Sequence, residues 1–229
     1  ILVGGDLQGK NPEIRNAEET RVAPGVALVA NARAYGDGGT VIVWADEATP
    51  FSGHISAQGG EQGGNGGFGE TSGKHVLYFR GTADFSARRG RRGTLLLDPA
   101  NITVVASNPD INGDGGNGDI QSPGDLDDAT GDRPGADSFI TGSQLASLLS
   151  NNSVTLAAEN NITVSAPVIR SGGPETTLTL TADTINSDST IGANPVAIRN
   201  LKLDAATSAT LNSTYKRGTL TSTSGAITF

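Results

Sequence analysis

The chain has no cysteine and no methionine, and only 4% of its 229 residues are aromatic. So few bulky apolar side chains exclude a conventional globular core. The absence of cysteine fits export, because an unpaired thiol is a liability outside the cell. No run of about 18 apolar residues occurs, so the sequence predicts no membrane insertion. Since the chain begins at Ile1 and lacks an initiating methionine, we expect a processed piece of a longer protein.

The chain is instead rich in aliphatic residues and threonine, and it contains 32 glycines. Hydrophobic residues make up 35% of the chain, which is too many for a disordered protein. This composition suits short strands that stack on one another, each burying one or two aliphatic side chains, with glycine-rich turns at the corners. The composition therefore favours an all-β fold with a thin, repeated core.

Short β-type runs separated by turn residues occur along most of the chain. Several runs in the first half are apolar on both faces, which favours parallel strands covered on two sides. Runs in the second half alternate aliphatic and hydroxyl residues, which predicts aliphatic side chains inside and hydroxyls outside. The predicted strands are 40–45, 53–57, 75–79, 94–97, 153–157, 161–164, 177–181, 201–204, 209–212, 218–221 and 226–229.

The chain divides into three regions, at 1–107, 108–139 and 140–229. Residues 108–137 are rich in Gly and Asp and poor in aliphatic residues, so we expect a surface loop inserted between two stacks of strands. Residues 141–149 place leucines at helical spacing behind a capping threonine, which predicts one short helix on the side of the rod. The glycine-rich stretch 59–67 predicts a tight corner or a flat turn.

Several ordered segments closely resemble filamentous-haemagglutinin-like exoproteins. These segments read GGTVIVWAD at 38–46, HISAQGG at 54–60, GGFGETSG at 66–73, FRG at 79–81 and GTLLLDP at 93–99. The resemblance is strong over 1–105 and weak over 140–229. It implies a right-handed parallel β-helix from a large bacterial adhesin, without catalytic residues, secreted to the cell surface by an outer-membrane two-partner transporter. The family's Asn-Pro-Asn-type secretion motif is not matched by Asn11-Pro12-Glu13, so the transporter would recognise a part of the parent chain that is not present here.

The charge of the chain is −8, which disfavours a nucleic acid or an anionic membrane as partner over most of the surface. Arg88, Arg89, Arg91 and Arg92 are the exception, since four guanidinium groups crowd one short loop. Arginine binds sulfate, phosphate and carboxylate groups through two oxygens at once, so the loop is a candidate polyanion-binding site, for instance for an acidic polysaccharide. Alternatively, the four arginines are solvated or paired with nearby acids, or mark a processing site.

A candidate calcium site lies in the Gly/Asp-rich region, at Asp110, Asn112, Asp114 and Asp119. Oxygen ligands at alternate positions followed by glycine reproduce the first half of an EF-hand-type loop. Gln121 stands where that loop has its bidentate glutamate, so a solvated acidic loop is the alternative.

No catalytic constellation can be argued from the sequence. His54 and His75 are the only histidines, each within a strand-like run, and no Ser–His–Asp arrangement follows from their spacing. Four Asn-x-Ser/Thr sequons, at Asn101, Asn151, Asn161 and Asn212, are either glycosylation sites or ordinary turn residues.

These features together predict a non-catalytic structural or adhesive module, a rigid extracellular rod for adhesion or for a biofilm matrix, whose ligand would be a polysaccharide or a host surface. The alternative is a subunit of an extracellular filament in which copies associate end to end. It rests on apolar, strand-like residues at both ends of the chain, Ile1 to Val3 and Ala226 to Phe229, without a polar cap.

Overall fold

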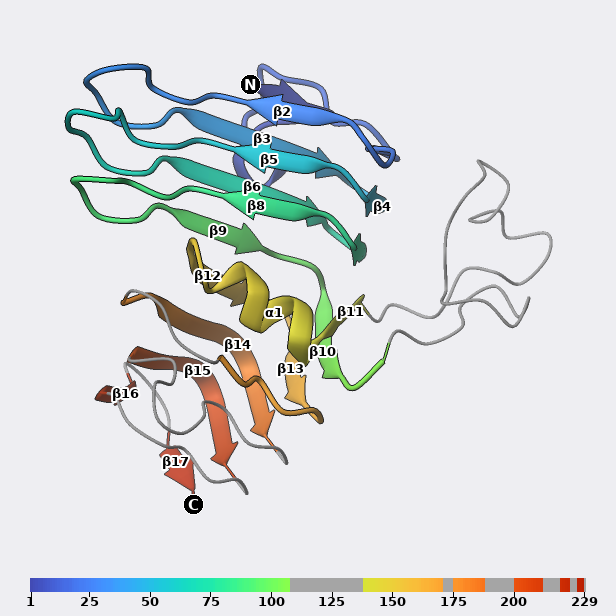
Figure 1. Cartoon of the computed structure of the whole chain (residues 1–229). Helices are drawn as coiled ribbons and strands as arrows, with labels where there is room; N and C mark the ends of the chain where they lie inside the picture. Colours follow the sequence, from blue (N-terminus) through green and yellow to red (C-terminus); the bar gives the residue numbers. More distant parts are fainter. Residues whose placement is uncertain (108–137, 171–174, 188–199, 212–218, 223–225, 229) are drawn as a thin grey trace.

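The computed structural model describes residues 1–107, 138–170, 175–187, 200–211, 219–222 and 226–228 (Figure 1). Every strand pair within this part of the chain is parallel, as expected from the sequence. Each strand pairs with a strand from the next turn of the chain: Thr40 pairs with Phe68, and Phe68 with Thr94. We call the stretch between two such partners one coil.

The strands form one strongly curled sheet, sheet A, and a small sheet B. One run of sheet A is β1 (Leu2–Val3), β3 (Thr40–Ala45), β6 (Phe68–Gly73), β9 (Thr94–Leu97), β12 (Ser153–Ala157) and β14 (Thr177–Ser187). The other run is β4 (Ala48–Phe51), β7 (Val76–Phe79), β11 (Ser138–Thr141), β10 (Asn101–Val105) and β13 (Asn161–Val164). The two runs meet at β14, whose first half pairs with β12 and whose second half pairs with β13.

The remaining strands extend this pattern. Below β14 lies β15 (Asn200–Leu211), which pairs with β16 (Thr219–Ser222) and β17 (Ala226–Thr228). Sheet B contains β2 (Ala27–Val29), β5 (His54–Ser56) and β8 (Thr82–Asp84), which lie in front of the first run of sheet A in Figure 1. Each early coil therefore has three strand-bearing sides around one apolar interior.

The interior is built of columns of aliphatic side chains in register. One column passes from Leu95 through Val154 and Leu178 to Leu201, and the parallel column consists of Leu97, Leu156, Leu180 and Leu203. All eight side chains are buried, whereas Thr155 and Thr179 on the same strands point outward and are half-exposed. The predicted alternation of aliphatic and hydroxyl residues is thus confirmed for these strands.

Aromatic side chains fill the wider first coils. Phe51 and Phe79 are register partners on β4 and β7, and their rings stack with centroids 5.3 Å apart. Gly69 leaves a gap above Leu95, and the ring of Phe85 occupies that space, since a Cβ at Gly69 would lie 2.3 Å from its Cζ. Phe85 is completely buried.

Helix α1 (Gly142–Leu148) forms as predicted, and the Thr141 hydroxyl accepts the N–H of Gln144 at 3.1 Å. Its place differs from the expectation of a helix on the side of the rod. It lies beneath β8, where the next strand of sheet B would be, and buries Leu145 and Leu148 in the core (Figure 1). Amphipathic spacing predicts a buried face, but it does not predict which edge that face will cover.

Strand β11 interrupts the regular order of coils. It follows β10 in sequence but lies between β7 and β10 in the sheet. The chain therefore steps back by one position on this side before α1 and β12 continue the stack. Residues 108–137, where the sequence predicts a surface loop, lie outside the described residues.

Candidate functional site

Three loops stack on one another at one side of the molecule (Figure 1). They join β2 to β3, β5 to β6 and β8 to β9, and the middle one contains 59–67, which has no strand, as predicted. Asp37 Oδ1 accepts the N–H of Asn65 at 2.6 Å, and Asn65 Oδ1 accepts the N–H of Arg91 at 2.9 Å. This ladder of side chains fixes the height of the arginine loop relative to the two loops above it.

The four predicted polyanion-binding arginines lie together in the third loop. Arg88, Arg89 and Arg91 are exposed, and Arg92 is half-buried. Within the part of the chain that the structure describes, none of these guanidinium groups forms an ion pair with an acid. Pairing with described acids, one of the alternatives left by the sequence, is therefore not seen. Because the positive charges are not neutralised there, they remain available to an anionic ligand.

Arg170 is a basic residue that sequence reasoning missed at this site. It is 3% exposed, and its Nη1 donates to Thr176 Oγ1 at 2.7 Å. Burial, together with the positive charge of Arg92, lowers the pKa of the Arg170 guanidinium. The charge of Arg92 therefore acts on Arg170 although the two residues are far apart in sequence, which no local pattern could have indicated.

The candidate calcium ligands Asp110, Asn112, Asp114 and Asp119 lie outside the described residues. Among the residues that are described, no group of three or more His, Cys, Asp or Glu side chains is arranged to hold a metal ion.

A polar groove of about 740 Å³ runs between sheet B and α1. His54, Asp84, Gln144 and Asn151 line it. The Nδ1 of His54 lies 2.8 Å from the Thr82 hydroxyl one coil away, while the Asp84 carboxylate accepts from Gln58 and from the N–H of Ser86. Asp84 is thus bound to other groups and does not orient the imidazole, and the His54–Thr82 contact is a stacking contact between register partners on β5 and β8.

The other predicted residues are dispersed. His75 is exposed and lies 3.9 Å from Glu47, in the turn before β7. Asn101 and Asn161 stack on neighbouring strands, with the Asn161 amide donating to Asn101 Oδ1 at 3.1 Å. Asn151 lines the groove beside α1, and Asn212 lies outside the described residues. Of the three sequons that the structure describes, two therefore lie side by side and Asn151 lies apart from them.

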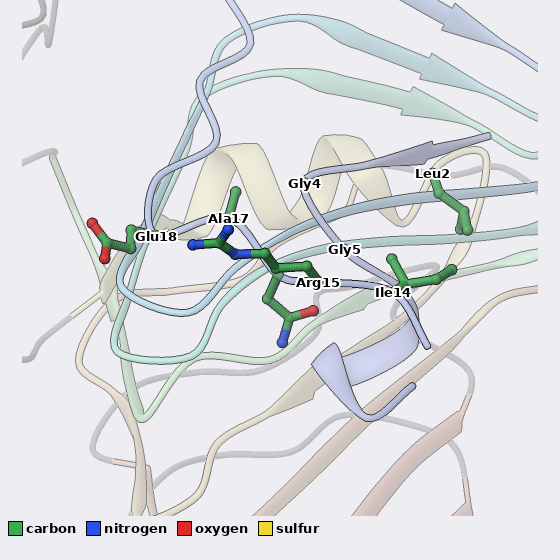
Figure 2. Close-up of a pocket in the computed structure, with 8 residues that line it drawn as sticks. Leu2, Gly4, Gly5, Ile14, Arg15, Ala17 and Glu18 are labelled. Atoms are coloured by element: carbon green, nitrogen blue, oxygen red, sulfur yellow. The ribbon is translucent and has the colours of Figure 1, made fainter. Parts of the chain in front are cut away.

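The amino-terminal residues 4–20, which we call the strap, fold back over the outer face of sheet A. The N–H of Ala17 donates to the carbonyl of Gly4 at 2.6 Å and closes the strap into a loop. An open hollow of about 600 Å³ lies beside it. Figure 2 shows Leu2 and Ile14 at one end of the hollow and Glu18 at the other. Arg15 lies between them, and the mixed lining indicates no particular ligand.

No protein-family model matches the chain, and no curated protein sequence matches it. The function is therefore inferred from the fold and from the exposed residues.

Proposed function

We infer that the protein is a structural and adhesive module of a secreted bacterial surface protein of the filamentous-haemagglutinin type. In this proposal the curled parallel sheet is a right-handed β-helix, and the chain is a non-catalytic rod. The observation that carries the proposal is the register of the aliphatic columns, which run from Leu95 to Leu201 and from Leu97 to Leu203 without a break.

Such a stack is stiff along its axis. Each coil pairs its backbone with the coils on both sides, and the aliphatic columns add apolar contacts at every step. A surface protein that must hold a binding site away from the cell needs this property. The same architecture supplies it without cysteine and with few aromatic residues, which agrees with the composition.

The arginine loop is the best candidate for the adhesive contact. Arg88, Arg89 and Arg91 project from a loop that two neighbouring loops hold in position, and they have no acidic partner among the described residues. A sulfated or carboxylated polysaccharide, or a host surface bearing one, fits this chemistry. We place the protein outside the cell, delivered by a two-partner transporter. No helix in the described ranges has the length and apolar character to cross a membrane.

Electron microscopy of the purified chain tests the rod. We expect short, straight particles of constant width, and a circular-dichroism spectrum with less than about a fifth helix, below the third found in average globular proteins. Compact particles without a long axis would contradict the proposal.

Association end to end is the second candidate, and the edges of the sheets favour it. Among the described residues, strand β1 pairs with β3 alone and β2 with β5 alone, so within this part of the chain each leaves one row of backbone groups open. Leu2 is 48% exposed and Val29 is 53% exposed on these strands. An open edge with apolar side chains is a template for another strand.

A further inference from the structure

The strap covers the only tryptophan of the chain. Trp44 lies on β3 and points away from the apolar core, yet it is only 4% exposed. Its carbonyl accepts the hydroxyl of Thr20 at 2.6 Å, and a Cβ at Gly9 would lie 2.5 Å from its Nε1. Asn16 donates to Asp46 Oδ1 at 2.9 Å, and Asp46 also accepts the indole N–H. The strap therefore seals this part of the outer face of sheet A.

Gln8 fastens the strap to two further coils. Its backbone N–H donates to Glu70 Oε2 on β6 at 3.0 Å, and its side-chain amide donates to Asp98 Oδ2 directly after β9. Lys10 Nζ donates to Gln8 Oε1 at 2.9 Å. Gln8 has a φ of 53°, in the left-handed region that non-glycine residues rarely occupy, so its attachment is maintained against backbone strain.

Glu70 is completely buried beneath the strap. Its Oε1 is buried without a hydrogen bond, and the nearby Asp98 carboxylate repels a negative charge on it. The charged groups that act on Glu70 are Asp98, which directly follows β9, and Lys10, which belongs to the strap. Burial first, and the charge of Asp98 second, raise the pKa of Glu70 to about 7, although hydrogen bonds from Gln8 and Ser72 and the charge of Lys10 oppose the shift.

We propose that residues 4–20 are a proton-sensitive strap, which is closed over sheet A while Glu70 is protonated and is released when Glu70 ionises. In the closed state an ionised Glu70 has one oxygen without a donor and faces a second carboxylate. Opening lets water reach both oxygens, so ionisation favours the open state. If the open state restores the ordinary pKa of 4.5, the equilibrium constant for closing the strap falls on the order of 300-fold between acid and mildly alkaline solution.

Trp44 reports this opening without a label, because it is the single tryptophan and lies under the strap. We expect acrylamide quenching of its fluorescence in the full chain to increase between about pH 5 and about pH 8.5, with a midpoint near the Glu70 pKa of about 7. The Glu70→Gln variant keeps a neutral group in the same place, so quenching should stay low at both pH values. Far-UV circular dichroism should be unchanged throughout.

Two controls separate Glu70 from other groups. Glu61→Gln changes an exposed carboxylate in the middle loop and should leave the transition unchanged. The double variant His54→Gln, His75→Gln removes both histidines of the chain, and the transition should persist. A wild-type chain whose Trp44 stays protected at about pH 8.5 would overturn the proposal. The same follows if Glu70→Gln shows the wild-type transition, or if the histidine variant abolishes it.

Discussion

At the scale of single residues, Gly69 and Phe85 show how the core changes along the stack. Below them the interior is an aliphatic column, whereas at β6 the column has no side chain, and the ring of Phe85, which follows β8 in the same coil, fills the space. The two residues are therefore complementary in volume. Neither residue is a conspicuous core residue in the sequence. Gly69 lies in a glycine-rich stretch, and Phe85 lies outside the predicted strands.

Phe85→Ala should destabilise the fold by about 3–5 kcal/mol, because it leaves a cavity beside Gly69. Gly69→Ala should also destabilise it, since the new methyl group meets the Phe85 ring. The double variant Gly69→Ala, Phe85→Leu should lose less free energy of unfolding than Gly69→Ala and Phe85→Leu lose in sum, because the smaller side chain makes room for the new methyl group. Urea unfolding of the four variants measures this coupling, and strict additivity would show that the two sites do not share one space.

The pH dependence of global stability follows from Glu70. Its folded-state pKa of about 7 lies above the ordinary 4.5, so the native chain holds a proton that the unfolded chain releases between these values. Stability from this group is therefore fully present below 4.5 and lost as the pH rises through 7, by on the order of 3 kcal/mol. Glu70→Gln should unfold at higher urea than wild type at about pH 8.5 and nearly equally at about pH 4.5. An equal advantage at both pH values would contradict this assignment.

The arginine loop gives a prediction for binding. Replacing Arg88, Arg89, Arg91 and Arg92 by Ser should abolish retention on a sulfated dextran matrix, and retention of the wild type should weaken steeply with salt. The Arg88→Ser, Arg89→Ser double variant should lose most of the retention. Arg15→Ser with Lys74→Ser removes the same charge from exposed residues elsewhere and should lose little. Equal losses in the two double variants would indicate attraction by net charge alone.

Sequence patterns identified some of these residues and not others. The four arginines are adjacent in sequence, so their crowding was visible at once. Glu70 and Arg170 were not singled out, because their burial depends on chain segments that are distant in sequence or unrelated in pattern. Glu70 is buried by a strap some 60 residues earlier, as its hydrogen bond to Gln8 shows.

At the scale of elements, the strands with alternating or continuous aliphatic residues were predictable. Strands β3, β9, β12 and β13 have the predicted bounds. Strand β6 was missed because its sequence, Phe-Gly-Glu-Thr-Ser-Gly, has two glycines and a charge, and β4 was missed because it contains Pro50. Both pair in register with an aliphatic neighbour, so tertiary pairing outweighs their weak local preference.

Asn152 links α1 to the edge of sheet B. Its amide nitrogen donates to the carbonyls of Ala83 and Leu148 at 3.0 and 2.8 Å, and its Oδ1 accepts the N–H of Phe85 at 2.6 Å. One buried side chain thus replaces the backbone partners that a further strand would give β8. The helix and this asparagine together close an edge that would otherwise be open to pairing.

Asn152→Ala should therefore cost about 2–4 kcal/mol, since it leaves several buried backbone groups without a partner. Asn151→Ala is the matched control, because Asn151 is half-exposed and forms no described side-chain hydrogen bond, and it should change stability by less than about 0.5 kcal/mol. Urea midpoints of the two variants provide the measurement. Similar urea midpoints for both variants would show that the hydrogen bonds of Asn152 add nothing to the covering of the β8 edge by α1.

At the scale of the whole molecule, the exposed edges of β1 and β2 are the surfaces on which the proposed end-to-end association depends. Leu2→Lys with Val29→Lys places a charge on each edge strand, which should suppress pairing between copies. We expect sedimentation of the wild-type chain to show larger species as concentration rises, and the double variant to stay monomeric. A wild type that remains monomeric at high micromolar concentration would contradict end-to-end association.

The position of β11 also sets the order in which the molecule can be completed. Strand β10 leaves one edge without its neighbour until residues 138–141, which come more than 30 residues later in the chain, have taken their place beside it. If the chain leaves a transporter amino terminus first, as proposed, it can finish the coils down to β9 before residues 138–141 have emerged. Assembly would then pause at this point, and during the pause the unpaired edge of the incomplete stack would be most exposed to proteolysis and to mispairing.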